Sequence, residues 1–312
     1  MRVFLWMALS LGVLIAHAVQ AREMVITVDD LPWVEFAHGT RSEIQPRHRR
    51  LLSALKGIPA IGFVNEAKLV DGAQLSLWRQ QMLIDWLDRG FELGNHTDNH
   101  NDLHQVPAEQ FEQSILRGER YLRPLLGQRQ QALRWFRHPY LHTGMDAATR
   151  ERITQFLAAH DYQVAPVTVD NGEWIYARAY LLALQQRDRA LQVKLRADYV
   201  DYMLAKVVFF EDAAQRQFER EIPQILLIHA NALNADALPD LLTVLRIRGY
   251  QFIALAQALA DPAYRHDDQF FGRGGISWLH RWALTDQFPK SHYEGEPSVP
   301  DWVLQLAGVD GE

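Results

Sequence analysis

Short apolar segments alternate with helical patterns along most of this 312-residue chain. Each segment has the length of a β-strand and is too short for a typical buried helix. The segments are residues 24–28, 60–64, 91–93, 133–136, 163–167, 225–228 and 251–254. Strands that alternate with helices predict parallel β-α-β units, which build either a barrel or a doubly wound sheet.

The composition suits one sizeable globular domain. Hydrophobic residues make up 48% of the chain and charged residues 22%, enough for a proper core. The net charge of -6 gives no reason to expect a nucleic acid or an anionic membrane as partner. The chain has no cysteine, so a bound metal would need nitrogen and oxygen ligands.

The N-terminus has the pattern of a secretory signal peptide. A positive charge at Arg2 precedes an apolar run over residues 3–16, and small residues follow at Ala18 and Ala21. An uncleaved anchor is the alternative, but the run is shorter than the ~20 residues that span a membrane. We therefore expect residues 1–21 to be cleaved, leaving a secreted or periplasmic protein without a membrane span.

Polar clusters follow or close five of the predicted strands. They are residues 27–30, 96–100, 137–140, 170–174 and 227–229. Barrel enzymes collect their site residues at the carboxyl ends of several different strands. The clusters therefore favour a barrel over a doubly wound sheet, and seven strand segments predict an irregular (β/α)7-8 barrel.

The first two clusters predict a metal site. His96 and His100 are four residues apart, so on a helical turn they would share one face and could bind one cation. A carboxylate from the pair Asp29-Asp30 would complete a His-His-Asp set with positions open for water and substrate. The ordinary alternatives are that the aspartates belong to a turn and that the histidines lie in the core or on the surface. The occurrence of both pairs at strand ends favours metal binding.

In chain order, the five clusters resemble the motifs of the polysaccharide deacetylase family, the NodB homology domain of carbohydrate esterase family 4. Residues 27–30 look like its Thr-Phe-Asp-Asp motif, and residues 94–100 are similar to its Asn-His-Thr/Ser-x-x-His motif. Residues 137–140 resemble Arg-x-Pro-Tyr, and 227–229 resemble Leu-x-His. The resemblance extends over about residues 24–255 and implies an acetylated oligo- or polysaccharide as substrate.

The resemblance implies a role for each matching residue. Asp29 would be the general base, His229 the general acid, and Asp30, His96 and His100 the ligands of one divalent metal ion. Zn²⁺ is the expected ion, and Co²⁺, Mn²⁺ and Ni²⁺ also suit this ligand set.

Four further residues take supporting roles by the same resemblance. Arg137 would orient the base, and the backbone N–H of Tyr140 would help to hold the oxyanion. Leu227 and Trp174 could form an apolar pocket for the acetyl methyl group.

Three positions depart from the family pattern. His138 replaces a common proline, and Leu141 follows the motif tyrosine where a glycine is frequent. Glu173 stands where an aspartate usually precedes the tryptophan, and its extra methylene moves the carboxylate by about 1.5 Å. We therefore expect either Glu173 or Asp170 to tune His229, directly or through the motif arginine.

Two segments lie outside the alternating pattern, and we expect the catalytic barrel to span residues 22–260. Residues 177–222, between the last two motifs, predict a helical hairpin that is either a packed decoration or a lid over the site. Residues 261–312 form an aromatic- and glycine-rich extension that could close the barrel bottom or line a sugar groove.

The sequence thus predicts a secreted, metal-dependent hydrolase that removes N-acetyl, or alternatively O-acetyl, groups from a carbohydrate. A glycosidase that uses Asp29 and Asp30 is disfavoured, because neighbouring carboxylates cannot flank a glycosidic bond at the ~5–9 Å separation required. A carbohydrate-binding protein with weak or no catalysis on the same fold is the alternative from another class.

Overall fold

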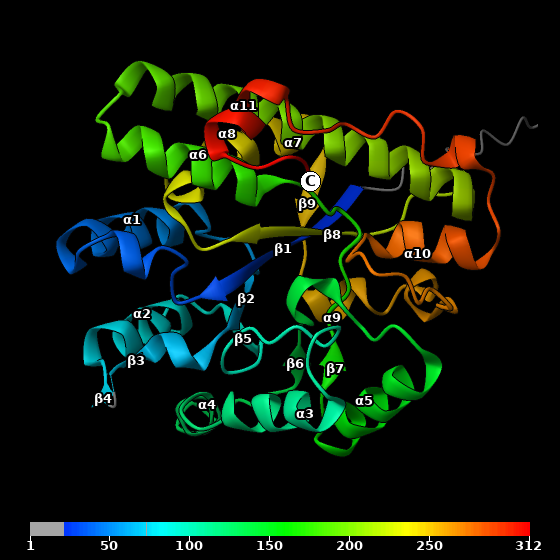
Figure 1. The fold of residues 1–312 in the computed structure, drawn as a ribbon, viewed down its shortest axis with the longest axis horizontal. Helices are drawn as coiled ribbons and strands as arrows, with labels where there is room; N and C mark the ends of the chain where they lie inside the picture. The colour runs from blue at the N-terminus through cyan, green and yellow to red at the C-terminus, as the bar shows by residue number, and fades with distance from the viewer. Residues whose placement is uncertain (1–21, 73) are drawn as a thin grey trace, which may run out of the picture.

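A computed structural model describes residues 22–72 and 74–312, so the predicted signal peptide lies outside the described residues. Seven parallel strands form the central sheet, in the order β7-β6-β5-β2-β1-β8, with β9 also paired to β1 (Figure 1). The strands are β1 (Arg22–Leu31), β2 (Ile61–Val64), β5 (Glu92–Asn95), β6 (Trp135–Phe136), β7 (Gln163–Val164), β8 (Gln224–His229) and β9 (Tyr250–Phe252). Each corresponds to a predicted apolar segment. A small antiparallel pair, β3 (Val70–Asp71) and β4 (Gln74–Leu75), lies apart.

The chain that follows β7 connects the two ends of this sheet. Val169 forms an isolated parallel bridge with Leu226 of β8, although β7 itself pairs with β6 at the opposite end of the strand order. Ile225 O also accepts a hydrogen bond from Thr168 N at 3.1 Å, and Thr168 Oγ1 accepts one from Ile225 N at 2.7 Å. The sheet therefore curls round into the predicted irregular barrel.

Helices cover the outside of the curled sheet (Figure 1). They are α1 (Arg41–Ala54), α2 (Leu77–Leu87), α3 (Ala108–Arg117), α4 (Leu122–Gly127), α5 (Ala147–Ala159), α8 (Ala232–Ile247) and α9 (Leu255–Ala258), with short 3₁₀ turns η1 (Phe36–His38), η2 (Glu66–Leu69) and η3 (Pro139–Leu141). Apart from α9, whose Leu255 and Ala258 belong to a second buried cluster, these elements join one extended cluster of buried side chains with the sheet. Within the described residues, no helix is long and apolar enough to cross a bilayer.

The segment between the last two motifs is a helical hairpin, as the sequence predicts. Its helices are α6 (Glu173–Gln185) and α7 (Arg189–Phe218), and the Asp188 side chain caps α7 by accepting from Leu191 N at 2.9 Å. Both helices contribute many buried side chains to the main core and pack on α8. The hairpin begins at Glu173, four residues before the predicted start, so a motif residue occupies the first turn of α6.

The C-terminal extension contacts both ends of the barrel. It contains η4 (Pro262–Arg265), α10 (Trp278–Thr285), η5 (Lys290–His292) and α11 (Asp301–Ala307). The Tyr264 hydroxyl donates to the carbonyl of Pro223, just before β8, so this part lies at the amino end of the barrel strands. Further along, Trp278 N donates to Val167 O at 2.8 Å, on the carboxyl side of β7.

Gly94 sits where β5 passes between an aromatic ring and a neighbouring backbone. A Cβ at this position would lie 2.5 Å from Cε1 of Phe63 and 2.9 Å from Trp135 O. We predict that Gly94→Ala lowers the free energy of unfolding by about 1–3 kcal/mol through overpacking, measured by urea denaturation.

Gly127→Ala is the matched control, because a Cβ there meets no atom within 4 Å. This variant should be neutral or slightly more stable than the wild type. Equal stability of the two variants would contradict the close packing around β5.

Candidate active site

The end of β1 brings two consecutive aspartates toward one imidazole. Successive side chains of a regular strand point to opposite faces. Here Asp30 has a φ of +68°, and the register with β2 shifts between Val28 and Leu31. As a result, His96 Nε2 lies 3.8 Å from Asp29 Oδ2 and 4.0 Å from Asp30 Oδ1.

Asp30, His96 and His100 form a set of potential metal ligands. One ligand atom from each lies within 4.8 Å of the others, and His100 Nε2 is 3.7 Å from Asp30 Oδ1. His96 Nδ1 bonds to Arg137 O at 2.8 Å, which leaves Nε2 to face the carboxylates. Asp30 Oδ1 is buried without a hydrogen-bond partner. The residues present therefore fit a divalent cation.

The two histidines converge through a tight turn. The prediction that they share one face of a helical turn was wrong, because Thr97 and His100 have φ values of +64° and +52°. The reason is local: Thr97 N donates to Asn95 Oδ1 at 2.7 Å, a side-chain bond that competes with helix formation. The predicted pairing of the rings nevertheless holds, with their centroids 4.8 Å apart.

Opposite charges surround the Asp30 carboxylate. Burial raises its pKa, but Lys68 and His100 outweigh burial and hold the pKa below its usual range. Lys68 Nζ lies 3.3 Å from Asp30 Oδ1 and donates to the Asp30 carbonyl at 3.1 Å. Burial lowers the pKa of His96 well below that of free histidine. The site thus presents an ionised carboxylate and a neutral imidazole, the protonation states that metal ligands require.

Arg137 is wholly buried beneath Asp29. Its Nη1 lies 3.8 Å from Asp29 Oδ2, its Nη2 donates to Thr27 Oγ1 at 2.9 Å, and its guanidinium covers the Phe63 ring at 4.8 Å. Burial raises the pKa of Asp29 to about 6, and Arg137 opposes this rise. A carboxylate in this range is suited to accept a proton near neutral pH.

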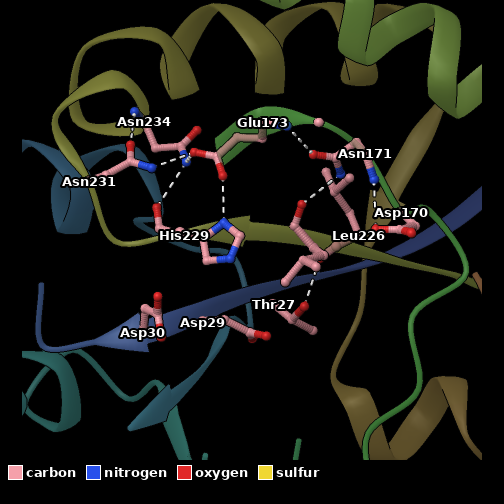
Figure 2. A network of polar contacts seen from close by, with 12 residues as sticks. Thr27, Asp29, Asp30, Asp170, Asn171, Glu173, Leu226, His229, Asn231 and Asn234 are labelled. Carbon is pink, nitrogen blue, oxygen red and sulfur yellow. Dashed lines mark hydrogen bonds and ion pairs between the residues drawn. The ribbon is translucent and has the colours of Figure 1, made fainter. Parts of the chain in front are cut away.

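His229 stands beside Asp29 on the neighbouring strand, and the two residues are register partners between β8 and β1 (Figure 2). Its Nδ1 lies 2.5 Å from Glu173 Oε2. Burial alone would lower the pKa of His229, but the Glu173 charge and hydrogen bond raise it to about 9. His229 is therefore an imidazolium at neutral pH and can donate a proton.

Two asparagines fix the Glu173 carboxylate from the far side (Figure 2). Asn231 Nδ2 and Asn234 Nδ2 both donate to Glu173 Oε1, the latter at 2.7 Å. Asn234 also donates to His229 O at 2.9 Å and accepts from the Tyr199 hydroxyl of α7 at 2.8 Å. The helical hairpin thus supplies both the carboxylate and part of its support.

The remaining predicted site residues differ in exposure. The ring of Tyr140 lies 4.4 Å from that of His100, and 54% of the residue is exposed. Trp174 is 45% exposed in the first turn of α6, whereas Leu227 is buried in β8. A surface aromatic next to Glu173 is consistent with a substrate-facing role, which stays a prediction.

A comparison with protein families identifies the domain. The model of the family described as polysaccharide deacetylase matches residues 16–165, which include the first three motifs. A comparison with curated proteins gave no match. Residues 16–165 of this chain therefore form a polysaccharide deacetylase domain.

Solved structures of the family share the fold. Wild-type BA3943, a CE4 family pseudoenzyme from Bacillus anthracis, aligns with a TM-score of 0.50 and 17% identity over 77% of this chain and 66% of its own. A BA3943 mutant described as having restored enzymatic activity gives 0.50 and 18% over 77% and 68%. Peptidoglycan deacetylase PdaC from Bacillus subtilis gives 0.48 and 18% over 79% and 94%. At this identity the likeness shows the fold alone.

The two carboxylates of the fourth motif take different places. Glu173 contacts His229, and Asp170 lies beyond Asn171, away from the imidazole (Figure 2). Burial raises the pKa of Asp170 to about 6, and Lys206 opposes this rise. The Asp170 charge also acts on Arg137, whose pKa burial lowers. The longer side chain of Glu173 therefore reaches the histidine directly.

A second group of potential ligands, Asp102, His104 and His142, lies near the family's third motif. Its two rings are stacked 3.8 Å apart at 7°, so their in-plane lone pairs run parallel and do not converge. His142 Nδ1 bonds to Asp102 at 2.6 Å, while His104 contacts Arg273 O and Gly144 N, each at 3.2 Å. These contacts assign the group to loop structure.

The His229–Glu173 contact gives a prediction for the acid. In Glu173→Gln the largest charge that raises the pKa is lost while burial remains, so the pKa of His229 should fall from about 9, although Asp29 and Asp30 still raise it. Because the protonated form is then lost at lower pH, the alkaline limb of a rate profile should move down with it. NMR titration of the metal-free protein, with the signal assigned by His229→Gln, measures this directly.

Asp170→Asn is the control and should leave the His229 pKa near its wild-type value. A pKa near 9 in Glu173→Gln would show that a group other than Glu173 stabilises the imidazolium.

Proposed function

We propose that this protein is a divalent-metal-dependent deacetylase that removes N-acetyl groups, or alternatively O-acetyl groups, from an acetylated oligo- or polysaccharide. One observation carries the proposal. A buried carboxylate, Asp29, and a protonated imidazole, His229, are register partners on adjacent strands, beside three potential metal ligands. A base and an acid in this arrangement suit hydrolysis of an amide, which needs a proton taken from water and another given to the leaving amine.

Asp30, His96 and His100 would hold the metal ion. Zn²⁺ is the proposed ion, with Co²⁺, Mn²⁺ and Ni²⁺ as alternatives for two imidazoles and a carboxylate. The ion would supply Lewis-acid polarisation of the acetyl carbonyl and a lower pKa for the attacking water. The protein contributes a fixed His96 ring through the hydrogen bond to Arg137 O.

Asp29 would act as general base. Asp29 is 2% exposed, and its Oδ1 is buried without a hydrogen-bond partner, free to accept a proton from water. Arg137, whose Nη1 lies 3.8 Å from Oδ2, would orient the carboxylate, and its charge opposes the rise in pKa that burial causes.

His229 would donate a proton to the leaving nitrogen, which without it would have to depart as a strongly basic amide anion. Glu173 stabilises the imidazolium and fixes the ring through Nδ1, so that Nε2 is the donor. We assign Asp170 a weaker part, acting on the charge of Arg137.

Tyr140, Leu227 and Trp174 would contact the acetyl group. The backbone N–H of Tyr140 has no acceptor within the described residues, so it is available to the oxyanion of the tetrahedral intermediate. Leu227 and the exposed Trp174 would line the apolar pocket for the methyl group. The N-terminal pattern over residues 1–21 supports a secreted or periplasmic location, where such polymers occur.

The deciding experiment measures acetate release by the mature protein. Chitooligosaccharides, acetylated peptidoglycan and acetylxylan should be compared before EDTA, after EDTA and after addition of Zn²⁺. We predict release on at least one substrate that EDTA abolishes and Zn²⁺ restores. Substrate binding without release in the Zn²⁺-loaded protein would favour the alternative, a carbohydrate-binding protein with weak or no catalysis.

Variants of the proposed base and of a proposed metal ligand should differ in metal content and in rate. Asp29→Asn should keep the metal and lose about 10²–10⁴-fold in kcat, because only the base is removed. The matched variant His100→Ala should lose metal affinity while the barrel stays folded, measured by metal stoichiometry and circular dichroism. A metal-free Asp29→Asn protein would reverse the roles of Asp29 and Asp30.

A further inference from the structure

The C-terminal extension packs directly against the loop that carries Tyr140. A Cβ built on Gly275 would lie 1.6 Å from the carbonyl oxygen of Tyr140 and 3.1 Å from Cβ of Leu141. Real Cβ atoms essentially never come within 3.0 Å of a heavy atom outside their own and the adjacent residues, and here the neighbour is backbone. Only glycine therefore fits at this contact.

Arg281 of α10 holds the same loop by hydrogen bonds. It is buried and donates from Nη1 to Leu141 O at 3.3 Å and from Nη2 to Thr143 Oγ1 at 2.5 Å. Its Nε donates to Asp268 Oδ2 at 2.9 Å, so the guanidinium is held from both sides. The extension thus supplies donors to the loop as well as close packing.

This part of the extension is anchored to the barrel. Trp278 N donates to Val167 O at 2.8 Å, and Ser277 Oγ donates to Thr168 O at 2.7 Å. The chain at residues 167–168 runs between β7 and the edge of β8. Contacts from Gly275 and Arg281 therefore fix the Tyr140 loop relative to the sheet that carries Asp29 and His229.

The loop needs such support because its backbone is unfavourable. Tyr140 and Leu141 have φ values of +57° and +56°, two successive left-handed residues, neither of them glycine. Only two turn bonds within the loop, Leu141 N to His138 O and His142 N to Pro139 O, each at 3.1 Å, stabilise this conformation. External contacts are what keep a strained conformation of this kind in place.

We propose that Gly275 and Arg281 are positioning residues that hold the backbone N–H of Tyr140 in place for the oxyanion. The proposal rests on the proposed deacetylase function and deepens it. It gives the extension a part in the hydrolytic step, through the loop beside His100. The two residues act through Tyr140 and do not contact the reacting atoms.

The test compares Gly275→Ala and Arg281→Lys with a matched control, Gly274→Ala. A Cβ at Gly274 meets only a side-chain atom of Ile276 at 3.6 Å, so the control adds the same methyl group without a clash. For each variant, kcat and KM for acetate release, metal stoichiometry and the melting temperature are measured. Selective ¹⁵N-tyrosine labelling gives a spectrum of ten tyrosine amides, in which Tyr140→Phe identifies the Tyr140 signal.

We expect a fall of up to about 10²-fold in kcat for Gly275→Ala, the effect of a displacement of about 1 Å, and a smaller fall for Arg281→Lys. KM and metal content should match those of Gly274→Ala, and the Tyr140 amide signal should shift in the two test variants only. If Gly275→Ala does not fold, Arg281→Lys carries the test.

Values of kcat and a Tyr140 signal equal to those of the control would overturn the proposal. So would a loss of metal in step with the loss of rate, because the extension would then support the whole site. A wild-type protein that releases no acetate would refute the deacetylase function instead. In that case a Tyr140 signal that shifts only in the test variants would still establish the positioning contact.

Discussion

The buried guanidinium of Arg137 connects the parts of this site. Its side chain balances Asp29, bonds to Thr27 and covers Phe63, while its own carbonyl oxygen orients His96. One residue at the end of β6 therefore sets both the charge of the proposed base and the tautomer of a proposed metal ligand. Burial makes the arrangement demanding, since an unpaired charge in the core costs several kcal/mol. The geometry of the strand ends must therefore keep Asp29 near the Arg137 guanidinium.

The strand segments and the collection of the motif residues could be read from the sequence because both follow from local patterns. Apolar runs predict strands, and parallel strands bring their carboxyl ends to one edge. The conformation of residues 96–100 could not be read in this way, since a side-chain bond from Asn95 overrides the helical spacing of the histidines. The choice between Glu173 and Asp170 also needed coordinates, because it depends on where α6 begins.

Residues that support the site were missed for a different reason. Lys68, Asn231 and Asn234 each bond to a proposed site residue, but they lie outside the five motifs. Lys68 comes from a 3₁₀ turn after β2, and the asparagines begin α8. Their side chains reach the site through packing between elements distant in sequence. A motif reports residues that perform the chemistry, whereas such partners are set by three-dimensional context.

Left-handed backbone at the strand ends indicates how the chain fixes its site. Asp30, Thr97, His100, Tyr140 and Leu141 all have positive φ values. Each such residue costs on the order of 1–3 kcal/mol, a large share of a stability that is typically about 5–15 kcal/mol in total. The conformations persist because hydrogen bonds and close packing over-determine them, from Asn95 at one loop and from the extension at another. The strands show parallel pairing, whereas the loops at their carboxyl ends contain strained residues. Such strain is expected where the backbone positions side chains for a chemical function at some cost in stability.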